Sequence, residues 1–365
     1  CVAAETQILT RNGYIPIAEL EGCVLDVWNG EDWSETTVVK TGENQKLLKV
    51  NTDSGQTIEC TEYHKFYVFT DYGKPFKEVR AHELKVGDKL IKFDLPVIDG
   101  TLKLTHAYMN GFYSGDGCCY KNDNIIYLYG EKRKLSHLFS HVRNWTTQEN
   151  QNREVLKMEH GVLQHKFFVP SDNYSVRSKL DWLAGWLDSD GCVYRNGTNQ
   201  QLVGNSIELE FLKEIQRMLQ TLGVSAKIKQ NAEAGYRKLP MNDGSGKNGD
   251  FWCQDSWRLL ITSCDVYKLI SLGLNLHRLK VVKMLPQRDA KQFVKIESII
   301  DTGRVDDTYC VNEPKRHMVM FNGILTGQCE EIHLPTKGIK NSGKLYEYSE
   351  DSGEIAMCFL SAIVL

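Results

Sequence analysis

Two cysteines at opposite ends of the chain could carry nucleophilic chemistry. Cys1 is the first of 365 residues, and Cys329 lies close to the other end. A thiol at the first position can attack the carbonyl that precedes it and convert a peptide bond into a thioester, and a second thiol can then accept the acyl group. A free thiol has a pKa of about 8.5, so nearby groups must help to deprotonate it. The chain opens without an initiator Met, so we expect a processed terminus or a deliberate cut at Cys1.

Two similar motifs, each ending in an aspartate and a glycine, could carry acid chemistry. They read MNGFYSGDG at 109–117 and LAGWLDSDG at 183–191, and their last acids are Asp116 and Asp190. Each motif has two small residues four positions apart, which share one face of a helix and permit a close approach of two backbones. These pairs are Gly111 with Gly115 and Gly185 with Ser189. The pattern predicts two packed helices that each end at a carboxylate.

The elements that would position these groups change along the chain. Residues 1–96 read as short strands punctuated by the turn signals Asn12-Gly13, Asn29-Gly30, Ser54-Gly55 and Tyr72-Gly73. Helical periodicity then falls in 104–115, 132–143, 179–189, 206–222 and 265–272. Strand-like runs alternate with it in 124–129, 165–169, 225–229 and 257–262. Short strands return in 293–328, which indicates a split β domain that hosts an α+β domain.

The composition argues against a membrane protein, a secreted protein and a globally basic DNA-binding protein. A hydrophobic content of 41% over this length can fill two or three cores. No apolar run is long enough for a membrane span, and the first residues lack the basic-then-apolar pattern of a signal peptide. We therefore expect a cytoplasmic protein. The eleven cysteines lack zinc spacing, so we expect reduced thiols. A net charge of −3 gives no global sign of nucleic-acid binding, so a DNA contact would need a local basic surface.

Both ends of the chain resemble the conserved blocks of inteins. The opening run CVAAETQILTRNGYIPIAEL, the TEYH of 61–64, RAHELKVGDKLIK at 80–92 and TYCVNEPKRHMVMFNGILTGQC at 308–329 occur in the family's order. The resemblance implies a mainly β splicing domain of the horseshoe-like Hint fold. We place its halves at residues 1–96 and 290–328.

The intein resemblance also implies roles for single residues. His64 would donate the proton to the departing amide, Thr61 would polarise the scissile bond, and Cys1 and Cys329 would be the two nucleophiles. The family's usual terminal His-Asn is replaced by Gly327-Gln328. Gln328 can cyclise to a six-membered imide, and His317 is the candidate for the acid-base work of the missing histidine. Cys310 lies where many inteins carry an aspartate, and a packing role for it remains open.

The two motifs resemble the LAGLIDADG signature of homing endonucleases, the second more closely than the first. The resemblance implies an α+β domain, here residues 97–289 and called the insert below, with the motif helices at a pseudo-twofold axis in a monomer. Asp116 and Asp190 would then meet and hold Mg²⁺, which can activate water for phosphodiester cleavage. Asp188 is the less favoured acid by position. If only one motif is considered, helix capping is the competing interpretation of its aspartate.

The endonuclease resemblance further implies a double-stranded DNA partner that contains the insertion site. The family reads the major groove with polar and basic side chains on curved sheets, so the basic residues of the insert are candidate phosphate contacts. They are Lys132, Arg133, Lys134, Lys227 and Lys229. Lys166 lies near the family's position for an auxiliary lysine.

The last 37 residues, 329–365, resemble the active-site region of class I ribonucleotide reductase large subunits. The matching runs are CEEIHLPTK at 329–337 and GEIAMCFLSAIVL at 353–365. By this resemblance Cys329 would be the radical cysteine, Glu331 its acid-base partner and Cys358 one of the reducing pair. The sequence therefore predicts a splicing element with an active endonuclease, flanked by host protein. Two alternatives stay open: a splicing element whose insert is an inactive DNA-binding remnant, and a reductase fragment.

Overall fold

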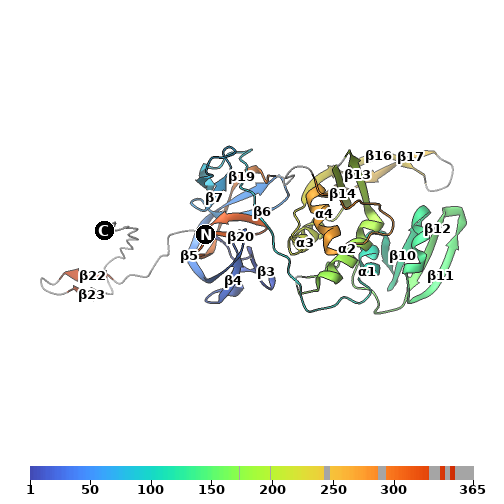
Figure 1. The fold of residues 1–365 in the computed structure, drawn as a ribbon, viewed down its shortest axis with the longest axis horizontal. Coiled ribbons are helices and arrows are strands. Elements are labelled where there is room, and N and C mark those ends of the chain that lie inside the picture. Colours follow the sequence, from blue (N-terminus) through green and yellow to red (C-terminus); the bar gives the residue numbers. More distant parts are fainter. Residues whose placement is uncertain are drawn as a thin grey trace.

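The structure is a computed structural model of the whole chain. It describes residues 1–171, 173–197, 199–241, 247–286 and 293–328, together with the backbone of 338–341 and 346–349. Figure 1 shows one lobe built from both ends of the chain and a second lobe built from the middle. The protein is mostly β with a few helices, as the sequence predicts.

Strands from both ends of the chain form one antiparallel sheet, which we call the large sheet. Within the described residues its order is β19-β1-β6-β5-β4-β2-β20-β21, with β3 paired to β2. From the first half come β1 (Val2–Ala3), β2 (Gln7–Thr10), β3 (Gly13–Pro16), β4 (Val24–Trp28), β5 (Trp33–Thr52) and β6 (Thr57–Thr61). From the second half come β19 (Ile296–Val311), β20 (Met318–Phe321) and β21 (Ile324–Gly327).

Two long strands hold the halves of the large sheet together. β5 and β19 pair from Val38↔Val311 to Thr52↔Ile296, with several register shifts along the way. Such shifts increase the local twist, which lets a long strand pair curve. Buried apolar side chains from both halves, including Val2, Val50 and Val319, form one core beneath the sheet. The first strand is therefore fixed beside the last ones.

Short elements complete this lobe. They are the 3-10 helices η1 (Ile17–Leu20) and η2 (Ala81–Glu83) and the hairpin of β7 (Lys65–Val68) with β8 (Lys77–Arg80). The four predicted turns are confirmed, because Gly13, Gly30, Gly55 and Gly73 all have φ between 80° and 97°. That left-handed region is open to glycine at little cost.

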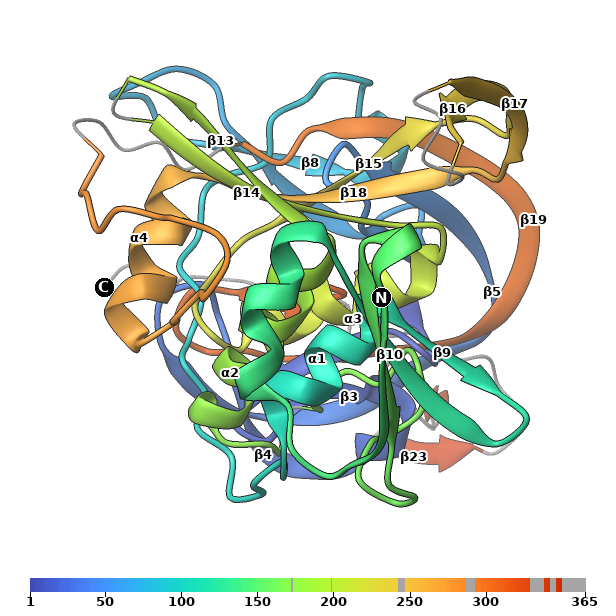
Figure 2. The ribbon, with the colours of Figure 1, turned by 90° about the vertical axis from the view of Figure 1, so that its right-hand side faces the viewer.

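The insert is built around two antiparallel helix-sheet units. The first contains α1 (Ala107–Asp116), β9 (Gly117–Tyr120), β10 (Asp123–Tyr129), β11 (Val142–Gln148) and β12 (Arg153–Met158). The second contains α2 (Val176–Asp190), β13 (Gly191–Asn196), β14 (Asn199–Ser206), α3 (Leu209–Gln220), β15 (Lys227–Ala232), β18 (Ser256–Ile261) and α4 (Ser263–Leu272). Strands β16 (Gly235–Pro240) and β17 (Asn248–Cys253) form a separate hairpin. In Figure 2, α1 and α2 lie side by side between the two units.

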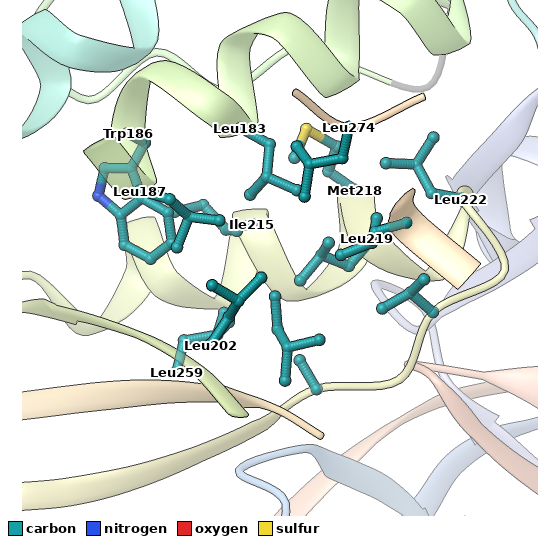
Figure 3. Packing of buried hydrophobic residues seen from close by; sticks show 14 of the residues in the cluster. Leu183, Trp186, Leu187, Leu202, Ile215, Met218, Leu219, Leu222, Leu259 and Leu274 are labelled. Carbon is teal, nitrogen blue, oxygen red and sulfur yellow. The ribbon is translucent and has the colours of Figure 1, made fainter. Parts of the chain in front are cut away.

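The second unit has the larger apolar core. Leucine and tryptophan side chains of α2, including Leu183, Trp186 and Leu187, pack against Ile215 of α3 and Leu259 of β18 (Figure 3). The first unit has a smaller core around Phe112 of α1. Both motif helices are thus anchored by their apolar faces, while their carboxyl ends point toward the strands that follow.

Two predicted elements are wrong. The segment 132–143, predicted as an α-helix, is the 3-10 helix η3 (Gly130–Leu138), followed by β11. Only Leu135 of η3 is buried, so this segment lacks the continuous apolar face that would stabilise an α-helix. The segment 165–169, predicted as a strand, contains a turn in which the Phe168 N–H donates to the His165 carbonyl oxygen at 3.0 Å.

The remaining described parts add little to the positioning of the sites. Strands β22 (Gly338–Asn341) and β23 (Tyr346–Ser349) pair as a hairpin. No helix in the described part of the chain is long and apolar enough to cross a membrane.

Candidate active sites

The amino terminus is buried at the first candidate site. Cys1 is 2% exposed, because β1 lies between β19 and β6. Its nitrogen is 3.1 Å from Nδ1 of His64 and 3.3 Å from Oγ1 of Thr61. In a longer precursor this nitrogen would be the amide nitrogen of the bond before Cys1. The Thr61 N–H also donates to the Cys1 carbonyl oxygen at 3.0 Å, so the backbone of the turn fixes the first residue.

His64 joins the two halves of this lobe. Its side chain is fully buried, and Nε2 lies 2.9 Å from Oγ1 of Thr326 on β21. Burial holds the pKa of His64 well below its ordinary value, and the positive amino group of Cys1 lowers it further, while Cys310 acts in the opposite direction. His64 is therefore neutral at physiological pH. A neutral imidazole that accepts at Nδ1 carries its proton on Nε2, where Thr326 is the acceptor.

Cys310 is adjacent to the first site. It is 1% exposed and clusters with Cys1 and Tyr63. The register explains the placement, because Val2 pairs with Tyr309, and Cys1 and Cys310 are the next residues along the antiparallel strands. The position fits either of the roles left open for Cys310.

Gln328 lies at the second junction with its side chain held on three sides. Its Nε2 is 2.9 Å from Oδ1 of Asn312 and 2.9 Å from Nδ1 of His317. The Glu313 N–H donates to its Oε1. The Gln328 N–H also donates to the His317 carbonyl oxygen at 3.2 Å. The structure thus brings together the predicted pair Gln328 and His317.

Three residues of these junctions were missed by sequence reasoning. They are Asn312, Glu313 and Thr326. Their positions in the sequence could have pointed to them. Asn312 and Glu313 lie between the end of β19 and Pro314, and Thr326 lies two residues before Gln328. Cys329, Glu331 and Cys358 lie outside the described residues.

The second candidate site is at the carboxyl ends of α1 and α2. A Cβ at Gly111 would lie 1.8 Å from the Trp182 carbonyl oxygen, and one at Gly185 would lie 1.9 Å from the Tyr108 carbonyl oxygen. The helices therefore touch backbone to backbone, as the small-residue spacing predicts. A Cβ at Gly115 would lie 2.9 Å from Oδ2 of Asp190, so the two motif ends adjoin.

The two carboxylates differ in their surroundings. Asp116 Oδ2 accepts an ion pair from Lys132 Nζ at 2.5 Å. Although Asp190 keeps some solvent access, crowding by protein atoms and, to a lesser extent, the negative charge of Asp116 together raise its pKa to about 6. Lys132 and Lys166 act in the opposite direction. The negative charge of Asp116 opposes the ionisation of Asp190, and a cation beside the two side chains would relieve that repulsion.

Lys166 lies beside the acids although its segment is no strand. Its Nζ donates to the carbonyl oxygens of Gly115 at 2.6 Å and Tyr113 at 3.0 Å. Burial lowers the pKa of Lys166, while the charges of Asp190 and Asp116 raise it. The amine therefore lies where it can affect a group bound at the acids.

Asp188 has a structural role. It is fully buried and accepts from the Tyr108 hydroxyl at 3.0 Å and from the backbone N–H groups of His277 and Arg278 at 2.7 and 3.0 Å. Arg278 in turn donates to the Gly191 carbonyl oxygen at 2.6 Å. Sequence reasoning missed Arg278, which fixes the end of α2 that carries Asp190.

The candidate DNA-contacting residues are in different settings. Lys134 and Lys229 are exposed. Arg133 pairs with Glu149 at 2.8 Å, and Lys132 is committed to Asp116. Lys227 pairs with Asp53 of the turn after β5 at 2.9 Å and donates to the Phe293 carbonyl oxygen at 3.0 Å. Lys227 therefore joins the two lobes, and its role in DNA binding stays a prediction.

The acidic pair fits a magnesium ion by its donor chemistry. Mg²⁺ is commonly held by one or two carboxylates and keeps several waters. The described residues contain no group of three or more His, Cys, Asp or Glu side chains that could hold a metal. Asp116 and Asp190 with water are the donor set that the described part of the insert offers.

Known proteins are similar to parts of this chain. The LAGLIDADG-like domain family matches residues 178–275, which include the second motif, α3 and β18. Over 380 aligned residues the chain is 41% identical to the ribonucleoside-diphosphate reductase large subunit of Invertebrate iridescent virus 6. That alignment covers all of this chain and 38% of the viral protein, so the chain spans just over a third of its relative's length.

Two solved structures are similar to separate parts of the chain. A variant of the Ssp DnaB mini-intein is 18% identical, with 28% of this chain and 65% of the mini-intein covered and a TM-score of 0.22. The homing endonuclease I-DmoI, in complex with DNA and calcium, is 16% identical, with coverages of 50% and 93% and a TM-score of 0.30. The chain contains a LAGLIDADG-like domain and is similar along its whole length to part of a ribonucleoside-diphosphate reductase large subunit.

Proposed function

We propose that the chain is an intein that splices itself out of a ribonucleoside-diphosphate reductase host through Cys1, Gln328 and Cys329. The observation that carries this proposal is the bridge made by His64, whose Nδ1 lies 3.1 Å from the Cys1 nitrogen and whose Nε2 lies 2.9 Å from Thr326. Thr326 is two residues from Gln328 in sequence. The bridge supports a single site for both junctions.

The first step exchanges one bond for another without net loss of a proton. The Cys1 sulfur attacks the carbonyl carbon of the preceding residue, and the C–N bond breaks as the C–S bond forms. The proton lost by the thiol is gained by the Cys1 nitrogen. His64 and Thr61 are within reach of that nitrogen. His64 Nδ1 is unprotonated at rest, so it must first receive the thiol proton before it can pass it to the nitrogen, while Thr61 is placed to polarise the bond. Cys329 then takes the acyl group from Cys1.

The second step frees the host. Gln328 Nε2 attacks the backbone carbonyl carbon of Gln328, and the bond to Cys329 breaks. His317 Nδ1, 2.9 Å from Nε2, is the group placed to take the proton. A cyclic imide remains on the intein, and the host segment is left with a free amine at Cys329, onto which the acyl group moves from sulfur to nitrogen.

We further propose that the insert cuts double-stranded DNA containing the insertion site. Asp116 and Asp190 would hold Mg²⁺, which supplies charge neutralisation at the phosphate and a more acidic water. Lys166 is placed to act on a group bound beside Gly115. Lys134 and Lys229 are the exposed candidates for phosphate contacts. After splicing, Cys329, Glu331 and Cys358 would serve nucleotide reduction in the host.

The ion pair between Lys132 and Asp116 favours a second candidate function for the insert. An ammonium group 2.5 Å from the carboxylate competes with a metal ion, so the insert could bind DNA without cutting it. Cutting of a plasmid that carries the uninterrupted host gene, with Mg²⁺ present, distinguishes the two. Active cleavage predicts linear plasmid that Asp116→Asn and Asp190→Asn each abolish. Retained DNA binding without linear product from the parent supports the inactive remnant.

One assay tests the splicing proposal. The chain is expressed with several host residues before Cys1 and its own host residues after Gln328, and the products are weighed. The proposal predicts joined flanks from the parent and none from Cys1→Ala or Cys329→Ala. Joined flanks from either alanine variant would contradict the assigned nucleophiles.

A further inference from the structure

The side-chain amide of Gln328 contacts three groups of one loop, residues 312–317. Its nitrogen faces two acceptors, Oδ1 of Asn312 and Nδ1 of His317, each at 2.9 Å. Its oxygen faces one donor, the Glu313 N–H. A rotated amide would set its oxygen against the Asn312 oxygen and its NH₂ group against the Glu313 N–H. The loop therefore selects a single orientation of the amide.

The carboxylate of Glu313 makes this loop rigid. Its side chain is fully buried and accepts from the backbone N–H groups of Arg316 at 2.8 Å and Lys315 at 3.0 Å. Asn29 Nδ2 donates to it from the other half of the lobe at 3.3 Å. These bonds fix the spacing between Asn312 and His317, although both side chains reach toward solvent.

An amide nitrogen is a poor nucleophile because it holds its protons tightly and shares its lone pair with the carbonyl group. The loop carries groups that can act on both the nitrogen and the oxygen of this amide. Removal of one proton makes the nitrogen nucleophilic and places negative charge on the amide oxygen. His317 is positioned to take that proton, and the Glu313 N–H is positioned to stabilise that charge. Asn312 keeps the remaining N–H from rotating away. The position before Gln328 is Gly327, which offers no side chain for this purpose.

We propose that Asn312 and the Glu313 N–H form the catalytic cradle for the cyclisation of Gln328, with Asn312 orienting the attacking nitrogen and Glu313 stabilising its imidate. This inference rests on the proposed splicing function and names groups that the intein resemblance did not. The N–C bond of the imide forms as the bond to Cys329 breaks, and the proton taken from Nε2 passes to the departing nitrogen.

The test measures both junctions in one precursor, the full chain with host residues before Cys1. Thiol-induced cleavage before Cys1 reports the first step, and release of the segment after Gln328 reports cyclisation. Asn312→Leu removes the acceptor with little change in shape, and loss of one hydrogen bond is expected to slow release about tenfold while leaving the first step unchanged. Asn312→Asp keeps an acceptor oxygen and should restore most of the rate.

Repeating the Asn312→Leu substitution in a Gln328→Asn variant distinguishes loss of amide orientation from general damage to the fold. In Gln328→Asn the amide is one methylene shorter and moves out of reach of Asn312, so Asn312→Leu should then slow release by less than about twofold. Asn150→Leu, the same change at an exposed position of the insert, is the matched control. Equal slowing of both junctions, equal slowing in both backgrounds, or no slowing would each overturn the cradle. A parent that joins no flanks would instead refute the splicing proposal itself.

Discussion

At the scale of the residue, surroundings decide what each ionisable group can do. His64 and Asp190 illustrate opposite cases, since desolvation lowers the pKa of the imidazole and raises the pKa of the carboxyl. The sequence identified both residues by their motifs. It could not identify Thr326 as the partner of His64 or Asn312 as the partner of Gln328, because a threonine or asparagine acts only through a distance that the fold sets.

Thr326 should matter to the junction at the other end of the chain. Thr326→Val removes the oxygen 2.9 Å from His64 Nε2 while keeping the shape. A buried imidazole N–H without an acceptor is costly, so we expect cleavage before Cys1 to slow about tenfold. Thr326→Ser should retain the rate. The measurement is thiol-induced cleavage of the precursor, and an unchanged rate in Thr326→Val would show that this contact does not serve the first step.

The raised pKa of Asp190 predicts a pH-dependent stability of the insert. A folded-state pKa of about 6 lies above the ordinary value of 3.8, so protonation favours the folded state. Its contribution is present below about pH 4 and is lost as the pH rises through about 6. Asp190→Asn replaces the carboxyl by a group that does not ionise, so the variant does not lose this stability as the pH rises. Because the group has solvent access, we expect a gain of only about 1 kcal/mol at pH 7.5 in metal-free buffer.

Urea unfolding of the parent and of Asp190→Asn at two pH values measures this effect. The difference between the two proteins should shrink as the pH is lowered from 7.5 to 5. A constant difference would mean that ionisation of Asp190 is not its source.

At the scale of the element, small residues at fixed spacing proved more informative than periodicity. The glycine spacing of the motifs predicted two touching helices, and Gly111 and Gly185 lie against opposing backbone. Periodicity misassigned 132–143 and 165–169, and each of these segments makes polar contacts with a motif end. Lys132 and Lys166 make those contacts with the motif ends.

Gly185→Ala tests the helix contact. Its methyl group would lie 1.9 Å from the Tyr108 carbonyl oxygen, and backbone cannot yield as a side chain can. We expect the insert to lose about 3 kcal/mol of stability and the protein to lose DNA cleavage. Gly235→Ala, where nothing lies within 4 Å, is the matched control. Normal cleavage by Gly185→Ala would contradict the close packing of α1 and α2.

At the scale of the whole molecule, the insert is bonded through α3 and β15 to the lobe built from both chain ends. Gln220 donates to the Gly323 carbonyl oxygen at 3.1 Å and accepts from the Tyr14 hydroxyl at 2.5 Å. The sequence predicted that both chain ends share one β domain, from their common texture and the order of their blocks. It could not predict this contact, because the helical pattern around Gln220 and the turn pattern around Gly323 carry no information about each other.

Alanine variants of Lys227 and Lys229 should distinguish a residue that joins the two lobes from one that binds DNA. Lys227→Ala breaks the ion pair with Asp53, so we expect lower thermal stability and little change in DNA affinity. Lys229→Ala removes an exposed positive charge, and we expect weaker DNA binding with a salt dependence reduced by about one phosphate contact. Titrations of target DNA at several salt concentrations measure both. The reverse pattern would return Lys227 to the DNA surface.

The central claim is that one site serves both junctions, with His64 between them. The most direct measurement is the mass of the products from a precursor with host residues on both sides, compared with the same precursor carrying His64→Ala. The account predicts joined flanks and an excised segment that ends in an imide at Gln328 for the parent. It predicts loss of the joined product for His64→Ala. Efficient joining without His64, or separate flanks from the parent, would contradict it.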